Sequence, residues 1–124
     1  MKKTLSLILA VLMLLSVTLA FASCGDANAD FKVGFIFLHD ENSTYDKNFI
    51  DAADAAAKAM GLTEDQVIMK VNIPEGPECY DAACELVDAG CDLIFADSFG
   101  HEDFMIQAAK EFKDVQFCHA TGTK

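Results

Sequence analysis

Polar and aromatic side chains follow the apolar runs of this chain at the points where the runs end. The run Leu93–Ala96 gives way to Asp97 and Phe99, and an earlier run is followed by Asp40 and Tyr45. An ionised aspartate can accept paired hydrogen bonds from neighbouring sugar hydroxyls, and an aromatic ring offers a face for stacking. This combination indicates a binding site for a small polar solute.

Helix capping is a second interpretation of the same polar residues. Asn42, Ser43 and Thr44 are residue types that cap helices well, and Asp46 follows Ser43 by three positions, like the acid of a capping box. The pair formed by Asp97 and Ser98 could serve in the same way at the next apolar helix. Capping and solute binding therefore both remain open from the residues alone.

Four nearly continuous apolar runs have the length of β-strands. They are rich in Val, Ile and Phe and show little alternation. Such runs are typical of strands that are covered on both faces, as in a parallel sheet. The runs are Lys32–Leu38, Val67–Ile73, Leu93–Ala96 and Val115–His119.

Helical stripes of apolar residues separate these runs. The first is Tyr45, Phe49, Ala53, Ala56 and Met60, with Gly61 where a left-handed C-terminal residue is expected. A second helix is predicted to open at Gly76-Pro77 and to close at Gly90, and a third carries its stripe from Phe104 to Phe112. The order β-α-β-α-β-α-β predicts an α/β fold with an open parallel sheet.

Ligands of open α/β sheets bind beyond the carboxyl ends of the strands, where the loops gather. The sequence therefore predicts that the candidate residues meet at one edge of the sheet. The loops concerned span 38–44, 73–77, 97–101 and 119–124, and two of them carry His101 and His119, which could be ordinary polar loop residues.

The amino terminus resembles a secretory signal. A basic start at Lys2 and Lys3 precedes an uncharged, Leu-rich segment, which is also long enough for an uncleaved signal anchor. Ordinary cleavage would occur before Ser23, whereas the letters FASC resemble a bacterial lipobox that would make Cys24 the lipid-bearing first residue. We favour the lipobox, and predict a signal at 1–23, a polar tether at 24–30 and a folded part at 31–124.

Charge and cysteine usage exclude several partners and cofactors. The formal net charge is −11, so the chain lacks the basic footprint that nucleic acids require, and any membrane contact is expected to come from the lipid. Cys79 and Cys84 would point to different faces of one helix and cannot bridge each other. No spacing of Cys and His suggests zinc, so we expect buried thiols and no cofactor.

The segment DLIFADSFGHEDFMIQAAKEFKDVQFCHATGTK, together with KVGFIF and an aromatic helix start, resembles the basic membrane protein family. Its members are PnrA-like solute-binding lipoproteins of ABC importers, several of which bind purine nucleosides. The resemblance covers Phe31–Lys124 and is strongest in Asp92–Lys124. It implies a type I periplasmic-binding-protein fold with two lobes, of which residues 31–124 make an incomplete first lobe. Binding by these residues alone is therefore expected to be weak or absent.

The resemblance also assigns positions. Tyr45 stands where the family places an aromatic residue that stacks on the base, and Asp46 stands where the family usually has Asn. Ser98 and Phe99 fall in the loop that approaches the ligand. With the residues above, the predicted ligand-binding set is Asp40, Asn42, Tyr45, Asp46, Asp97, Ser98 and Phe99.

The sequence thus predicts a non-enzymatic solute-binding lipoprotein. We expect it to lie on the outer face of the cell membrane and to deliver a nucleoside-like solute to an ABC permease. One alternative is an exported, flavodoxin-like phospho-receiver or hydrolase, in which Asp40, Glu41 and Asp97 hold Mg²⁺ near Thr121. Another is an anchored ligand sensor that serves no importer.

Overall fold

The computed structural model describes residues 30–124, so the predicted signal, Cys24 and all of the tether before Asp30 lie outside the described residues. Residues Phe31–Lys124 form one compact unit. It has four strands, β1 (Val33–Ile36), β2 (Val67–Lys70), β3 (Leu93–Ala96) and β4 (Gln116–His119), which pair in the order β2-β1-β3-β4. All the pairings are parallel. The predicted α/β fold and element order are confirmed.

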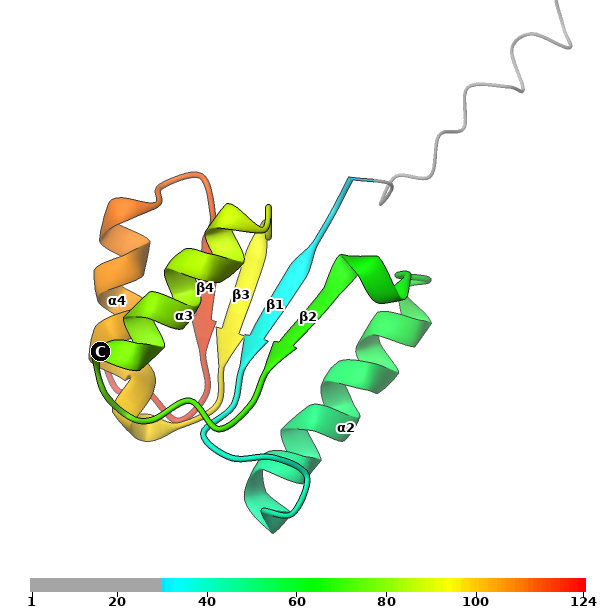
Figure 1. Cartoon of the computed structure of the whole chain (residues 1–124), viewed down its shortest axis with the longest axis horizontal. Coiled ribbons are helices and arrows are strands. Elements are labelled where there is room, and N and C mark those ends of the chain that lie inside the picture. The colour runs from blue at the N-terminus through cyan, green and yellow to red at the C-terminus, as the bar shows by residue number, and fades with distance from the viewer. Residues whose placement is uncertain (1–29) are drawn as a thin grey trace, which may run out of the picture. The chain divides into compact units, whose positions relative to one another are not determined.

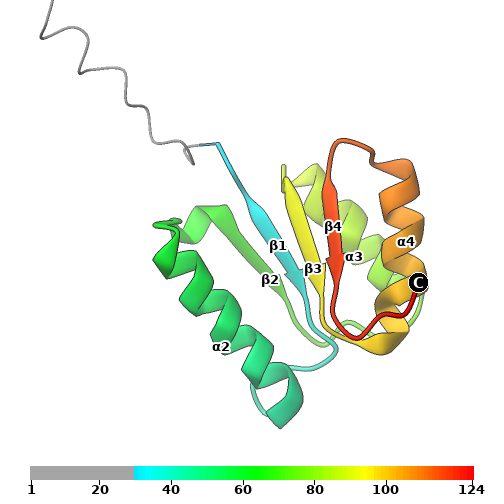
Figure 2. The ribbon, with the colours of Figure 1, turned by 180° about the vertical axis from the view of Figure 1, so that it is seen from behind.

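Three α-helices connect these strands: α2 (Thr44–Ala59), α3 (Pro77–Asp88) and α4 (Glu102–Glu111). Two short 3-10 helices, η1 (Glu64–Gln66) and η2 (Phe99–His101), precede β2 and α4. Figure 1 shows α3 crossing in front of the sheet, and Figure 2, from behind, shows it beyond the strands. Residues of α2 line a groove together with residues of β1 and β3 on the face of the sheet away from α3 and α4, so the strands lie between two helical layers.

Local sequence signals fix the helix ends where they were predicted. Ser43 is the N-cap of α2, and its side chain accepts a hydrogen bond from the Asp46 backbone N–H at 3.3 Å. Pro77 occupies the first position of α3. Gly61 and Gly90 follow α2 and α3 with φ of 70° and 85°, a left-handed conformation that glycine adopts without strain.

Strand β2 is shorter than its apolar run. The prediction extended this strand to Ile73, but the structure ends it at Lys70. Asn72 has φ of 59°, and this left-handed turn takes the chain out of the ladder. After this turn the chain pairs once more with the segment that follows β1, because the Ile73 N–H donates to the Phe37 carbonyl at 3.0 Å.

Alternate residues of the strands pack into two different layers. Ile36 and Ile94 are fully buried against α3 and α4, together with Leu86 of α3. Gly34 is needed there, since a Cβ at this position would lie 2.8 Å from a methyl carbon of Leu86. The core that holds the carboxyl edge in place is therefore the layer between the sheet and the α3–α4 pair.

On the opposite face an apolar groove of about 460 Å³ runs between α2 and the sheet. Phe35 stacks on Phe37 and on Phe95, with ring centroids 5.9 and 5.6 Å apart. The groove reaches Asp97 at the carboxyl end of β3. Within residues 30–124, no helix is long and apolar enough to cross a membrane.

Candidate functional site

Hydrogen bonds tie the loops at the carboxyl edge of the sheet to one another. The Leu38 N–H, after β1, donates to the Asp97 carboxyl at 3.2 Å. The Tyr45 hydroxyl donates to the Asp97 carbonyl at 2.8 Å, and the His119 ring, at the end of β4, bonds the Ser98 carbonyl. The structure therefore brings the predicted loops together at one edge.

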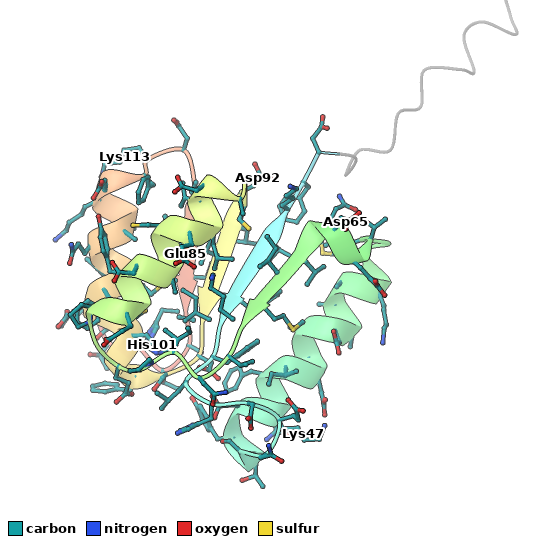
Figure 3. The ribbon with its side chains drawn as sticks, in the orientation of Figure 1. Lys47, Asp65, Glu85, Asp92, His101 and Lys113 are labelled. Carbon is teal, nitrogen blue, oxygen red and sulfur yellow. The ribbon has the colours of Figure 1, made fainter. Side chains whose placement is uncertain are left out.

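Figure 3 shows the two ends of the unit by their labelled side chains. His101 and Lys47 lie toward the carboxyl ends of the strands, whereas Asp92 and Asp65 lie toward the opposite end. The candidate solute site occupies the former end.

Asp97 is the buried centre of this edge, with 2% of its surface exposed. Burial, and after it the neighbouring Asp46 carboxylate, raise the pKa of the Asp97 carboxyl to about 7. One carboxyl oxygen accepts from the Leu38 N–H, and the other has no hydrogen-bond partner within residues 30–124. Asp97 does not cap α4, because the N-cap of that helix is His101 and no side chain bonds there.

Asp46 is also fully buried, yet it holds a charge. Burial pushes the pKa of Asp46 upward, but hydrogen bonds from Ser43 and His39 outweigh it and hold the pKa at about 2. Its oxygens accept from the Ser43 hydroxyl at 2.6 Å and from the His39 N–H at 2.9 Å, with the His39 ring at 3.1 Å. The carboxylate is thus used to fold the β1–α2 loop, and a solute contact by Asp46 stays a prediction.

Tyr45 and Phe99 are the exposed aromatic residues of this edge, with 44% and 62% of their surfaces exposed. The Tyr45 ring is held by its hydroxyl and by Phe49, whose ring centroid lies 5.1 Å away. Phe99 begins η2 and lies between Ser98 and Gly100. Two aromatic faces are therefore available to a flat molecule.

Asp40 and Asn42 form a turn of their own. One oxygen of the Asp40 carboxylate accepts from the Asn42 backbone N–H at 3.0 Å and from its side-chain amide at 2.9 Å. These bonds hold the pKa of Asp40 below its usual range. Asn42 is exposed and Asp40 half-buried, so both lie at the rim beside the site.

Two residues of the edge were missed or misread from sequence. Glu75, in the loop after β2, accepts hydrogen bonds from the Ser98 hydroxyl and, at 2.9 Å, from the Gly100 N–H. The interpretation of His101 as an ordinary polar loop residue was wrong, because it is fully buried and its Nε2 donates to the Ile73 carbonyl at 2.9 Å. Burial lowers the pKa of His101, which favours the neutral ring.

The acidic residues proposed for Mg²⁺ do not form a metal-binding group. Among residues 30–124, no cluster of three or more His, Cys, Asp or Glu side chains could hold a metal ion. Asp40 is turned toward Asn42, while Asp97 is buried. All four cysteines of this part of the chain are free thiols, and burial raises the pKa of Cys79 to about 12, far from the range of a reactive thiolate.

Comparison with known proteins shows a sequence relative and two structural neighbours. No protein-family model matches the chain. It is 33% identical over 117 residues to a purine-binding protein of Brucella abortus (strain 2308), an alignment that covers 90% of this chain and 33% of that protein. The chain thus spans about a third of the length of this relative. The likeness supports a relation to substrate-binding proteins.

The structural neighbours show the fold. A solute-binding protein of an ABC transporter system from Conexibacter woesei DSM 14684 superimposes with a TM-score of 0.59 and 22% identity, over 70% of this chain and 28% of that one. A transcriptional activator of the comK gene from Bacillus halodurans gives 0.63 and 18%, over 73% and 30%. The chain has the α/β fold of periplasmic solute-binding proteins.

Proposed function

We propose that the chain is a solute-binding component of an ABC importer and that its solute is a purine or a nucleoside. The observation that carries this proposal is the 33% identity, over 117 residues, to a protein named for purine binding. The solute would bind at the carboxyl edge of the sheet, which is the edge that open α/β sheets use for ligands. A binding function requires no nucleophile or metal.

The chemistry of the edge supports a flat, uncharged solute. Tyr45 and Phe99 offer exposed rings on which a base can stack, and Asp40 offers a carboxylate at the rim for ribose hydroxyls. The net charge of −11 opposes a phosphorylated solute. A nucleoside or free base therefore fits this edge better than a nucleotide does.

We further propose lipid anchoring at Cys24, which would hold the protein on the outer face of the membrane beside its permease. The lipobox-like letters FASC support this anchor. The basic membrane protein family remains the specific family that we propose, on the SFG and HATG segments of the sequence.

Thermal denaturation with a panel of solutes tests the proposed solute class. Adenine or adenosine should raise the melting temperature of the full chain by an amount that grows with the logarithm of ligand concentration above Kd, because a ligand that binds only the folded state stabilises it. AMP and ribose are the matched controls, and neither should raise it comparably. The proposal commits to weak binding, the first of the two outcomes that the family resemblance allowed. No rise with any purine at millimolar concentration would therefore contradict it, as would a rise with AMP equal to that with adenosine.

A further inference from the structure

Glu75 bridges two loops of the carboxyl edge that are far apart in sequence. It lies in the loop between β2 and α3, and one of its carboxylate oxygens accepts from both the Ser98 hydroxyl and the Gly100 N–H, the latter at 2.9 Å. Those two donors belong to the residues on either side of Phe99. A single carboxylate oxygen therefore fixes both neighbours of the most exposed aromatic ring at this edge.

The fit of Glu75 against this loop is close. A Cβ added to Gly100 would lie 2.7 Å from the Cβ and Cγ of Glu75. Since φ at Gly100 is not left-handed, the glycine is required by this approach and not by its backbone conformation. The Glu75 stem lies directly on the Gly100 backbone, which restricts the loop further.

Other bonds hold the ends of the same loop. The His101 N–H donates to the Ser98 carbonyl at 3.0 Å, and the buried His101 ring is bonded to Ile73, two residues before Glu75. With its backbone held at both ends, the Phe99 ring has few ways to move except by side-chain rotation. Hydrogen bonds from Ser98 and Gly100 also hold the pKa of Glu75 below its usual range, so it carries its charge at neutral pH.

We propose that Glu75 is a positioning residue for the solute site, which holds Ser98 and Gly100 so that Phe99 is presented in a fixed place as a stacking face for a purine base. This inference rests on the proposed function. A side chain that is already ordered before binding loses less conformational entropy when the ligand binds. Loss of the hydrogen bonds from Ser98 and Gly100 to Glu75 should therefore weaken purine binding without abolishing the fold.

Two substitutions of Glu75 in the full chain test the proposal. Glu75→Gln keeps an oxygen that can accept both bonds, whereas Glu75→Ala removes it. The alanine variant should bind adenine about two- to tenfold more weakly, and the glutamine variant should stay within about twofold of wild type. Glu64→Ala is the matched control, because Glu64 lies in η1 at the opposite edge of the sheet.

Two readouts keep the outcomes distinct. Amide exchange by NMR should be faster at Gly100 in Glu75→Ala than in wild type, while Glu75→Gln stays protected and the melting temperatures of both change little. Unchanged Gly100 exchange in Glu75→Ala would show that Glu75 does not hold Gly100, and would overturn the proposal. Faster exchange with unchanged adenine affinity would overturn the positioning role alone. If wild type itself bound no adenine, the proposed function would fail, and the positioning role would fail with it.

Discussion

The buried carboxyl of Asp97, at the end of β3, lies beside the buried carboxylate of Asp46, in the first turn of α2, and each group shifts the pKa of the other. The two acids have opposite pKa shifts: that of Asp97 is raised to about 7 and that of Asp46 is lowered to about 2. The difference follows from their partners, because the loop 39–43 surrounds Asp46 with donors, whereas Asp97 receives one backbone N–H. At mildly acidic pH the pair shares one proton.

From these two pKa shifts we predict that the free energy of unfolding falls both when pH rises toward 7 and when pH falls toward 2. Folded Asp97 keeps a proton that the unfolded chain releases, so its contribution is complete below pH 3.8 and is lost as pH rises toward 7. Folded Asp46 is ionised, so its contribution is present above pH 3.8 and is lost as pH falls toward 2. Urea denaturation at successive pH values should show both losses.

Asp97→Asn tests separately the loss of stability that occurs as pH rises. Asparagine can accept from the Leu38 N–H and donate to Asp46 without any ionisation, so the free energy of unfolding at pH 8 should rise by on the order of 2–4 kcal/mol relative to wild type. Asp54→Asn, on the exposed side of α2, is the control and should follow wild type across the pH range. Parallel curves for wild type and Asp97→Asn would show that Asp97 is not held protonated.

Much of the fold could be predicted because the apolar patterns of its strands and of its helices differ clearly in the sequence. The strand runs are almost continuously apolar and the helix stripes recur every three or four residues, so the α/β order followed directly. The prediction ran past the end of β2 because it weighed the apolar Val71 and Ile73 over Asn72, a residue type that adopts the left-handed conformation more readily than most. Only the left-handed conformation of Asn72 ends the ladder there.

The site was predicted as a location more securely than as a set of contacts. Strand-end loops had to meet at one edge, so the sequence could place Asp97, Ser98 and Tyr45 there, and their contact with a solute stays a prediction. Which of the two acids would have its oxygens hydrogen-bonded by neighbours depends on His39, which lies seven residues before Asp46. No local sequence pattern encodes this contact. The Gly76-Pro77 signal placed Glu75 in a rim loop but gave no reason to single it out.

The hydroxyl and the ring of Tyr45 should be separable by substitution. Tyr45→Phe loses the hydrogen bond to the Asp97 carbonyl, which should lower the free energy of unfolding by about 1 kcal/mol and leave purine binding nearly intact. Tyr45→Ala removes the stacking face and should weaken adenine binding by tenfold or more. Calorimetric titration of both variants checks this, and equal affinities for the two would rule out stacking on Tyr45.

Gly100→Ala should destabilise the fold through Glu75. The new methyl group would overlap the Glu75 stem, at a cost of about 1–3 kcal/mol. In a Glu75→Ala background the same substitution should cost less, because the Cγ and Cδ of Glu75 are gone and only its Cβ still overlaps the new methyl group. Chemical denaturation of the two single variants and the double variant measures this coupling, and additive effects would argue against the close packing of these residues.

Cys24→Ser should abolish lipid attachment in a bacterial host. Metabolic labelling with a radioactive fatty acid should mark the wild-type chain and not the variant, since the thiol is the proposed acceptor. Cys118→Ser, in β4, is the control and should be labelled like wild type. Labelling of Cys24→Ser at the wild-type level would refute the lipobox assignment.

Titration of the isotopically labelled chain with adenosine, followed by NMR at each backbone amide, tests the central claim most directly because it detects even millimolar binding and locates it. The account predicts saturable shifts that concentrate at Tyr45, Ser98, Phe99 and Gly100, with none at Asp65 or Asp92 on the opposite edge. Saturable shifts centred on that opposite edge, or no shifts at millimolar adenosine, would contradict it.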